Sequence, residues 1–388
     1  MERALLPRLS AILLCCLSVG MAKSIRLSSL RWSTIIINNF WCSFGDTVFN
    51  IRRVSMKKFK VAVVGATGMV GNKFLEVLTE RNLPIEEYYL YASKKSAGKV
   101  INFMGKDHVV IELNEENIKK YPVDFALFSA GGSTSGEYAP VFAKCGATVI
   151  DNSSFWRMHD DVPLVVPEVN PSDVDWNHGI IANPNCSTIQ AMLPLKALHD
   201  KYGIKRVVFS TYQAVSGAGV GGFNDLKNGV EGIAPQKFNK PIAFNCLPQI
   251  DVFEADGYTK EEHKMINETR KILGLPSLKV TATTVRVPVF HGHSESVNVE
   301  FERPCTLEGI KETLAAFPGI IVQDDIKNCE YPMAITAEGH DEVFVGRIRL
   351  DDSVESGCNL WVVADNIRKG AATNAVEIMQ LLMEKASK

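Results

Sequence analysis

Cys186 is the residue of this chain whose surroundings best fit a nucleophile. It lies in the segment NPNCST (183–188), directly before a helical pattern at 189–198, where Ser187 or a neighbour can cap the helix. Free N–H groups and the dipole at a helix N-terminus stabilise a thiolate, which favours covalent catalysis. A buried, inert thiol is the alternative. Pro194 lies inside the pattern and predicts a kink or a shorter first helical segment.

An arginine and two histidines occur together in the segment VRVPVFHGHSES (285–296), as Arg286, His291 and His293. A cysteine nucleophile needs a proton-transfer partner, which a histidine can supply. The two histidines are two residues apart, so both are expected to face one side of an extended segment. A structural, hydrogen-bonded histidine is the alternative for each. No third ligand with recognisable spacing accompanies them, so we predict no metal site.

A glycine-rich turn indicates a nucleotide site. The motif GATGMVG (65–71) follows an apolar strand pattern at 60–64 and precedes a helical pattern at 72–81. Glycines at such a turn let the backbone approach a pyrophosphate, which the helix N-terminus binds. A tight turn that only needs positive φ is the alternative. The predicted cofactor contacts in the motif are Gly65, Ala66, Thr67, Gly68, Met69 and Val70.

The end of the second predicted strand favours NADP over NAD. NAD-binding proteins place an acidic residue there, bonded to the ribose 2′-hydroxyl. In this chain the strand at 88–92 leads into SKKSAG (93–98), which has no acid. Ser93, Lys95 and Ser96 instead suit a 2′-phosphate, through charge-assisted hydrogen bonds. A solvated basic loop is the alternative.

The elements that must position these residues predict two domains. Residues 56–184 alternate strand and helix patterns, which indicates an α/β fold with a Rossmann-type doubly wound parallel sheet. A C-terminal helix, with its pattern at 371–384, is expected to pack back on this domain, which residues 367–388 complete. Residues 185–366 have longer connections between strands, which predicts an α+β domain with a mixed sheet. The other predicted strands are 109–113, 125–129, 148–151, 207–211, 279–289, 296–301, 344–350 and 359–364, with a Gly-rich loop at 216–222 and a helix at 307–317.

Composition excludes several classes of protein. The 388 residues carry a formal net charge of −2, so there is no basic field that would indicate nucleic-acid binding. No apolar run reaches the roughly 18 residues of a membrane-spanning helix. The nine cysteines form no C-x-x-C pair and no regular disulfide spacing, which is typical of a reducing compartment.

Residues 1–55 differ from the rest, with seven Lys/Arg and two acids. The apolar run at 11–21 resembles a secretory signal, and the Ser/Arg-rich stretch at 24–31 resembles an organellar transit segment. A third interpretation is that Met56 is the true start and the upstream part is absent from the mature protein. We predict a cytoplasmic location or a plastid-like organelle.

Several motifs together resemble the aspartate-semialdehyde dehydrogenases. They are, in chain order, GATGMVG, SAGGSTS, DNSSFWR, VPEVN, NPNCST, QAVSGAG and VRVPVFHGHSES. The resemblance runs from Met56 to the C-terminus, and it is to the branch typical of Gram-positive bacteria, in which a short loop follows the glycine motif. It implies that residues 185–366 form the catalytic and dimerisation domain.

The resemblance also implies roles for matched residues. Cys186 would carry a thioester, His293 rather than His291 would be the acid/base, and Gln213 would orient the substrate. The implied substrate-binding residues are Arg286 for the α-carboxylate, Glu261 or its neighbour Glu262 for the ammonium, Lys264 and Arg157 for the phosphate, and Asn185 beside the reacting carbonyl. The remaining implied cofactor contacts are Ser216, Gly217 and Asn366.

The implied reaction is the reversible, NADPH-dependent reductive dephosphorylation of L-4-aspartyl phosphate to L-aspartate 4-semialdehyde, with phosphate as co-substrate of the reverse direction. It belongs to lysine, threonine and methionine biosynthesis. The resemblance further implies a homodimer or homotetramer. Two alternatives are an N-acetyl-γ-glutamyl-phosphate reductase, which would not need an ammonium-binding acid at Glu261, and an inactive NADP-binding paralogue.

Overall fold

The computed structural model describes residues 41–44, 47–50 and 57–387. The chain divides into two compact units, residues 1–56 and 57–388. The described part of the first unit is an antiparallel hairpin of β1 (Trp41–Phe44) and β2 (Thr47–Asn50). The apolar run at 11–21, the Ser/Arg-rich stretch at 24–31 and Met56, on which the three interpretations of the N-terminal segment rest, lie outside the described residues.

The first sheet of the second unit has six strands in the order β10-β9-β8-β3-β4-β7, and every neighbouring pair is parallel. This confirms the Rossmann-type doubly wound sheet. Its strands are β3 (Phe59–Val64), β4 (Ile85–Ala92), β7 (Ile111–Glu112), β8 (Phe125–Phe128), β9 (Thr148–Asp151) and β10 (Ile180–Ala182). The helices among them are α2 (Met69–Arg81), α3 (Glu115–Lys120) and α4 (Gly132–Lys144).

The single strand predicted at 109–113 is wrong. The segment is divided between β6 (Lys106–Val109), which pairs antiparallel with β5 (Val100–Phe103), and β7, which pairs with β4. Val110 separates the two, and its N–H donates to the Lys99 carbonyl (2.8 Å). Consecutive residues of one apolar run therefore belong to strands of two different sheets, and hydrophobicity alone does not predict this division.

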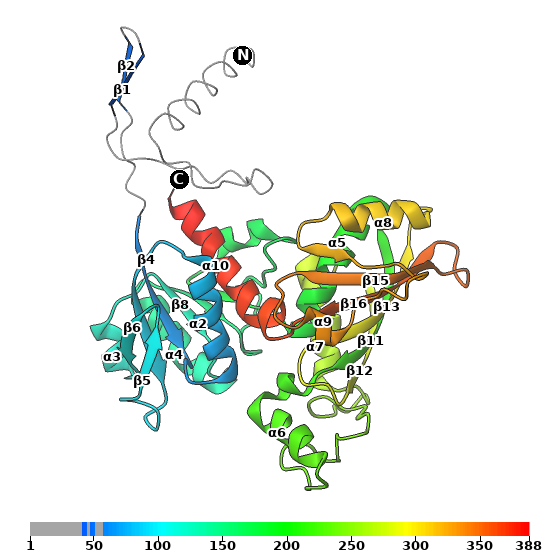
Figure 1. Cartoon of the computed structure of the whole chain (residues 1–388), viewed down its shortest axis with the longest axis horizontal. Coiled ribbons are helices and arrows are strands. Elements are labelled where there is room, and N and C mark those ends of the chain that lie inside the picture. Colours follow the sequence, from blue (N-terminus) through cyan, green and yellow to red (C-terminus); the bar gives the residue numbers. More distant parts are fainter. Residues whose placement is uncertain (1–40, 45–46, 51–56, 388) are drawn as a thin grey trace. The chain divides into compact units, whose positions relative to one another are not determined.

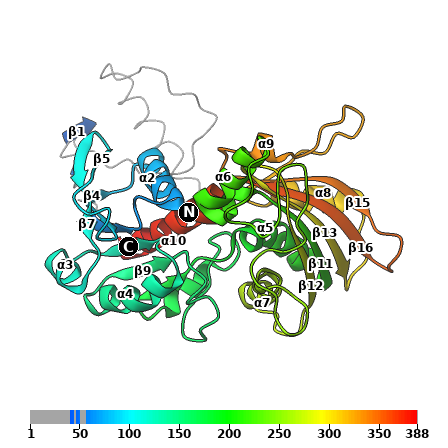
Figure 2. The same ribbon diagram turned by 90° about the horizontal axis from the view of Figure 1, so that it is seen from below.

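Both faces of the first sheet are covered by helices. Val61 and Val63 of β3 lie in a buried cluster with Phe74 of α2, whereas Ala62 and Val64 lie in another with Phe142 of α4. The C-terminal helix α10 (Thr373–Ala386) joins the cluster on the α2 side, so the expected packing of this helix is confirmed (Figure 2). Each buried valine or leucine stabilises this arrangement by about 1.5–3 kcal/mol relative to exposure.

The second sheet is mixed, as predicted, with the order β12-β11-β13-β16-β15-β14 (Figure 1). Its strands are β11 (Ile204–Gln213), β12 (Lys279–Arg286), β13 (His293–Phe301), β14 (Ile320–Val322), β15 (Val343–Leu350) and β16 (Gly357–Ala364). The accompanying helices are α5 (Cys186–Tyr202), α6 (Gly219–Gly229), α7 (Lys260–Leu273), α8 (Leu307–Ala316) and α9 (Ala334–Ala337), with short turns of 3-10 helix at Pro171–Trp176 and Val215–Ala218 and of π-helix at Arg368–Ala372.

Two sequence predictions in this half are wrong. The shorter first helical segment expected from Pro194 is not seen, since α5 runs through this residue without a break; the helix is buried on nearly all sides, and packing outweighs the lost hydrogen bond. The Gly-rich stretch at 216–222 is helical rather than a loop. Its glycines allow close packing, since a Cβ built on Gly222 would lie 3.0 Å from the ring of Phe238.

Candidate active site

Cys186 is the first residue of α5, and Asn185 caps that helix. The Asn185 side-chain oxygen accepts hydrogen bonds from the backbone N–H groups of Ser187 (3.0 Å) and Thr188 (3.3 Å). Packing is close on the other side, because a Cβ built on Gly370 would lie 2.9 Å from the Cys186 Cβ. The thiol is thus fixed at the start of the helix, as the sequence predicted, with Asn185 rather than Ser187 as the cap.

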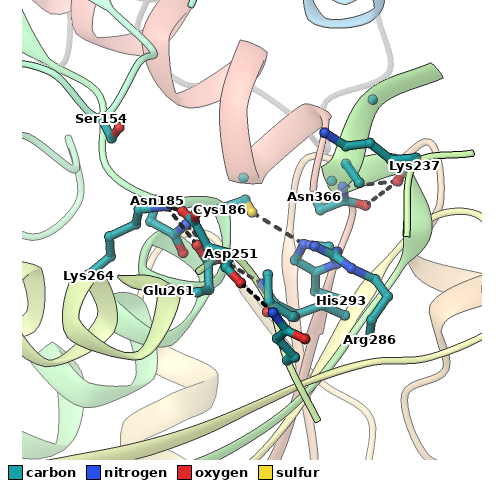
Figure 3. Close-up of a pocket in the computed structure, with 18 of the residues that line it drawn as sticks. Ser154, Asn185, Cys186, Lys237, Asp251, Glu261, Lys264, Arg286, His293 and Asn366 are labelled. Atoms are coloured by element: carbon teal, nitrogen blue, oxygen red, sulfur yellow. Dashed lines mark hydrogen bonds and ion pairs between the residues drawn. The ribbon is translucent and has the colours of Figure 1, made fainter. Parts of the chain in front are cut away.

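His293, the first residue of β13, lies with its Nε2 3.2 Å from the Cys186 Sγ (Figure 3). Its Nδ1 accepts a hydrogen bond from the Ala214 backbone N–H (3.0 Å). We infer from this bond that the neutral imidazole carries its proton on Nε2, toward the sulfur. His291 lies outside the pocket, 3.9 Å from Glu338. The expectation that both histidines face one side is wrong, because Gly292 adopts φ +84° and turns the chain.

Burial controls the charges of this pair in the ligand-free protein. It raises the pKa of the Cys186 thiol to about 12, with a further contribution from the negative charge of Glu261. It lowers the pKa of His293 to about 3, assisted by the Arg286 guanidinium. The prediction of a thiolate favoured by the helix N-terminus is therefore corrected for this state, because loss of water around the sulfur outweighs the opposing effects of Arg286, Arg157 and the Ser187 backbone N–H on the pKa.

Two groups of opposite charge lie beside the thiol. Arg286, at the end of β12, is buried, and one guanidinium nitrogen donates to the Ala214 carbonyl (2.7 Å). Glu261 of α7 accepts from Asn185 (2.9 Å), Gln213 (3.1 Å) and Lys264 (3.1 Å). Burial alone would raise the pKa of Glu261, but Lys264 and the amide donors lower it to about 2.

Glu262, the alternative to Glu261, lies in the first turn of α7 and stabilises the N-terminal end of this helix. One of its carboxylate oxygens accepts from the Thr259 backbone N–H (2.7 Å) in a capping box, and the other accepts from the Thr284 N–H (3.0 Å). Both oxygens are occupied in holding the helix. Of the two glutamates, Glu261 is the one that faces the pocket.

Arg157, in the segment that follows β9, is a further charged residue of the pocket wall. Its guanidinium donates to Glu268 of α7 (3.1 Å) and to the Asn152 carbonyl (3.0 Å). Both side chains of the Arg157–Glu268 pair are almost fully buried, at 8% and 1% exposure. A cation of this kind at the pocket wall suits an anionic group of a ligand.

One pocket of about 820 Å³ brings most of the predicted residues together. Its lining includes Met69, Val70, Arg157, Asn185, Cys186, Gln213, Ser216, Gly217, Glu261, Lys264, Arg286, His293 and Asn366. Gly217 packs closely against two of these side chains, because a Cβ there would be 3.0 Å from Arg286 and 3.3 Å from His293. Asn366 exchanges hydrogen bonds with Ser216 and accepts from the Gly292 N–H (3.0 Å).

The other predicted cofactor residues lie outside this lining, at the carboxyl ends of β3 and β4. They are Gly65, Ala66, Thr67, Gly68, Ser93, Lys95 and Ser96. The two strand ends are joined, since the N–H groups of Gly65 (2.9 Å) and Ala66 (3.1 Å) donate to the Tyr91 carbonyl. Ser93 and Lys95 are exposed on the loop that follows β4.

The turn between β3 and α2 fits a pyrophosphate. Helix α2 has no side-chain cap at Gly68 and no acid in its first turn, which leaves its N-terminal N–H groups open to an anion. Gly65 adopts φ +86°, and a Cβ on Gly71 would overlap the Gly65 carbonyl oxygen. The glycines thus allow the tight approach of helix to strand that a dinucleotide site needs.

Sequence reasoning missed several residues of this region. Lys237, on the chain segment after α6, and Gly370, in the π-helical turn, line the pocket without any recognisable motif. Glu268 had a detectable signal, because it lies seven residues, or two helical turns, after Glu261 and so faces the same side. Asp251 binds Lys264 (2.9 Å) from a loop that no local pattern marks.

Two further features are absent from the described ranges. Residues 41–44, 47–50 and 57–387 contain no group of three His, Cys, Asp or Glu side chains placed to hold a metal ion. In the same ranges, no helix combines the length and apolar character needed to span a bilayer.

The fold and the pocket define a dehydrogenase with a nicotinamide nucleotide-binding domain, and family models agree. The model of the semialdehyde dehydrogenase NAD binding domain matches residues 60–176. The model of the semialdehyde dehydrogenase dimerisation domain matches residues 195–369.

Relatives then identify the family. An aspartate-semialdehyde dehydrogenase of Aquifex aeolicus is 61% identical over 336 residues, 84% of this chain and 98% of that protein. One of Bacillus subtilis is 48% identical, over 83% of this chain and 96% of the relative. The crystal structure of aspartate semialdehyde dehydrogenase II of Vibrio cholerae complexed with ASA has a TM-score of 0.81 at 48% identity and covers 84% of this chain and 99% of that one. This chain belongs to the aspartate-semialdehyde dehydrogenases, which confirms the resemblance seen in its motifs.

Proposed function

We propose that this protein catalyses the reversible, NADPH-dependent reductive dephosphorylation of L-4-aspartyl phosphate to L-aspartate 4-semialdehyde, through a thioester on Cys186. The observation that carries the proposal is the 3.2 Å approach of the Cys186 Sγ to His293 in a pocket that also holds Arg286 and Glu261. The reaction has its place in lysine, threonine and methionine biosynthesis. The Aquifex and Bacillus relatives support the choice of substrate.

The charges of the pocket match those of the substrate. The Arg286 guanidinium can form a bidentate pair with the α-carboxylate. Glu261, ionised well below neutral pH, can bind the ammonium. Arg157 and Lys264 can neutralise the phosphate. Gln213, whose side-chain amide donates to Glu261, lies where it can orient the reacting carbon.

The chain's own residues account for the covalent steps. The Cys186 sulfur attacks the acyl carbon, the carbon–oxygen bond to phosphate breaks, and the thiol proton leaves with the phosphate, so that a thioester and hydrogen phosphate result. NADPH, when bound, supplies the hydride that reduces the thioester. The Nε2–H of His293 can donate a hydrogen bond to the resulting oxyanion, and the adduct then collapses to the aldehyde and a cysteine thiolate, which takes up the one proton that the reduction consumes.

One oxyanion donor is available on the backbone. The Asn185 N–H donates to Glu268 (2.6 Å) and is therefore occupied. We propose the Cys186 N–H, at the open first turn of α5, as the donor, and such a donor contributes about 3 kcal/mol in comparable sites. Asn185 contributes through its side chain, which caps α5 and holds Glu261.

For the cofactor we propose NADP(H). The turn at Gly65–Gly71 would hold the pyrophosphate, the loop with Ser93, Lys95 and Ser96 would bind the 2′-phosphate, and Asn366 with Ser216 and Gly217 would lie near the nicotinamide. A solved relative supports this, since the aspartate semialdehyde dehydrogenase of Candida albicans, with a TM-score of 0.68 and 28% identity over 86% of this chain and 100% of that one, was crystallised with NADP.

Nucleotide binding and catalysis would belong to different domains. We propose that residues 56–184, completed by 367–388, hold the nucleotide and that residues 185–366 hold the catalytic groups and the subunit interface of a homodimer or homotetramer. For the compartment we keep the cytoplasmic part of the prediction, which the bacterial relatives support. The same bacterial relatives give no support for a plastid-like organelle.

A spectrophotometric assay tests the proposal. Purified protein is mixed with NADP, inorganic phosphate and L-aspartate 4-semialdehyde, and NADPH formation is followed. We expect turnover that requires phosphate. Turnover of only the semialdehyde of N-acetylglutamate would replace the proposed substrate, and no turnover of either would leave an inactive NADP-binding paralogue.

The covalent step is tested by Cys186→Ser. A serine hydroxyl is a far weaker nucleophile than a thiolate, so kcat should fall by about three orders of magnitude or more while the fold is retained. Stopped-flow trapping and mass spectrometry of the acyl enzyme should find the adduct in the wild type alone. Wild-type kcat in the variant would rule out the thioester.

A further inference from the structure

Helix α7 presents four charged side chains along one face. Glu261, Lys264, Glu268 and Lys271 follow one another at spacings of three, four and three residues, which places them on one side of a helix. The first two line the pocket, where they were assigned to the substrate ammonium and phosphate. The other two lie one and two turns further along and have no assigned role.

Glu268 joins two parts of the site with its two carboxylate oxygens. One oxygen accepts from the Arg157 guanidinium (3.1 Å), and the other accepts from the Asn185 backbone N–H (2.6 Å). The carboxylate is only 1% exposed, and its burial raises the pKa, which the Arg157 charge opposes. The cap of the helix that carries Cys186 and the cation at the pocket wall are thus held by one side chain.

Lys271 anchors the segment that carries Arg157. Its amine donates to the backbone carbonyls of Arg157 (2.8 Å), His159 (2.7 Å) and Val162 (2.8 Å). All three donor positions of the ammonium are therefore used on one stretch of chain that has no regular secondary structure. The Arg157 backbone is fixed by Lys271, and its side chain is fixed by Glu268.

We propose that Glu268 and Lys271 are positioning residues for phosphate recognition, which fix Arg157 and the Cys186 helix cap to the same face of α7. The inference deepens the proposed function and rests on it for the assignment of Arg157 to phosphate. One rigid helix then fixes the position of the phosphate-binding Arg157 relative to the nucleophile Cys186. If the arginine were mobile, phosphate binding would be weaker, because ordering its side chain would cost conformational entropy.

The test uses Glu268→Gln and Lys271→Met. Glutamine has the shape of glutamate but one acceptor oxygen, so it cannot bind both Asn185 and Arg157, and its amide hydrogens would face the guanidinium. Methionine keeps the apolar stem of Lys271 and removes its three donors. For each variant we expect the KM for phosphate to rise about tenfold or more, with the KM for NADP changed by less than about twofold.

A second readout does not depend on turnover. Inorganic phosphate should protect Cys186 of the wild type from alkylation by iodoacetamide. The phosphate concentration that gives half protection should rise in both variants by the same factor as the KM. Lys271→Arg, which keeps the charge and the donors, should restore both values to near those of the wild type.

Arg270→Met is the matched control. Arg270 also donates to a backbone carbonyl, that of Leu278 (2.9 Å), from the same helix but away from the pocket. We expect its phosphate KM and half-protection value to stay within about twofold of the wild type. The inference is overturned if Glu268→Gln and Lys271→Met keep wild-type phosphate values, or if Arg270→Met shifts them equally. Phosphate protection without any turnover of the wild type would instead overturn the proposed function alone.

Discussion

Cys186 and His293 form a pair that is neutral before ligands bind. Because burial raises the pKa of the thiol to about 12 and lowers that of the imidazole to about 3, the thiol is protonated and the ring uncharged across the neutral range. The thiolate that attacks the substrate must therefore be stabilised by the ligand-bound site, where Arg157 and Arg286 are the neighbouring cations.

This state predicts a particular pH dependence of thiol reactivity. A raised thiol pKa means that the thiolate fraction keeps increasing with pH, so the rate of alkylation of the ligand-free protein should rise up to and beyond pH 9. A lowered His293 pKa means that this curve should show no inflection near pH 6.5. Iodoacetamide kinetics with mass-spectrometric detection of Cys186 measure the curve. A plateau reached by pH 7 would contradict the effect of burial.

At this scale the sequence allowed the positions to be predicted but not the charges. Cys186, His293 and Arg286 could be found from the NPNCST and VRVPVFHGHSES segments, and the structure places all three in one pocket. The thiol pKa depends on burial, to which Gly370 contributes by close packing, and on the negative charge of Glu261; both residues are distant in sequence, and no local pattern indicates their effect. Likewise, only the capping contacts of Glu262 separate it from Glu261.

The loop after β4 is the element that should select the cofactor. Ser93→Asp with Lys95→Glu would place negative charge where the 2′-phosphate of NADP is proposed to bind. We expect kcat/KM for NADPH to fall roughly tenfold to hundredfold, because charge-assisted hydrogen bonds are replaced by repulsion, while the value for NADH should change little.

The control for this prediction is Lys99→Glu, a charge reversal on an exposed lysine of the same loop that is not assigned to the phosphate. Steady-state kinetics with both cofactors compare the variants. Equal loss with NADPH and NADH in the double variant would show damage to the loop rather than loss of a phosphate site.

Among the elements, strands with a clear run of apolar residues were predicted closely, whereas two helices were missed or predicted incorrectly. Strands β3 and β9 match the predicted ranges closely because each is a short apolar run buried on both faces. Helix α7 was missed although the Thr259–Glu262 capping box and Gly274 mark its two ends in the sequence. Its role could not be predicted, because it depends on contacts with Asn185 and Arg157 that lie far away in sequence. In α5, burial outweighed the signal of Pro194.

At the scale of the whole molecule, the second sheet has an outer face that suits a second copy of the chain. Tyr212 of β11 is 40% exposed there and its ring lies 5.4 Å from that of Trp361 of β16. Exposed apolar side chains border them at Tyr331 and Met333. The match of residues 195–369 to a dimerisation domain agrees with this use of the face.

Tyr212→Asp tests the predicted interface. A buried, unpaired carboxylate in each subunit would oppose association, so the variant should sediment as a monomer at concentrations where we expect the wild type to have twice the mass of one chain. Val109→Asp, on the exposed hairpin of β5 and β6, is the control and should keep the wild-type mass. Analytical ultracentrifugation distinguishes the outcomes, and an unchanged mass in Tyr212→Asp would place the interface elsewhere.

The packing of α10 against β3 and α2 has a consequence for how the protein is made. Val61 and Phe74 leave the ribosome long before Val376 and Met379, which share their buried cluster. The nucleotide-binding half therefore keeps an open apolar face during synthesis until α10 has emerged. We expect the nascent chain to bind a chaperone during this interval, because its exposed apolar surface is prone to aggregation.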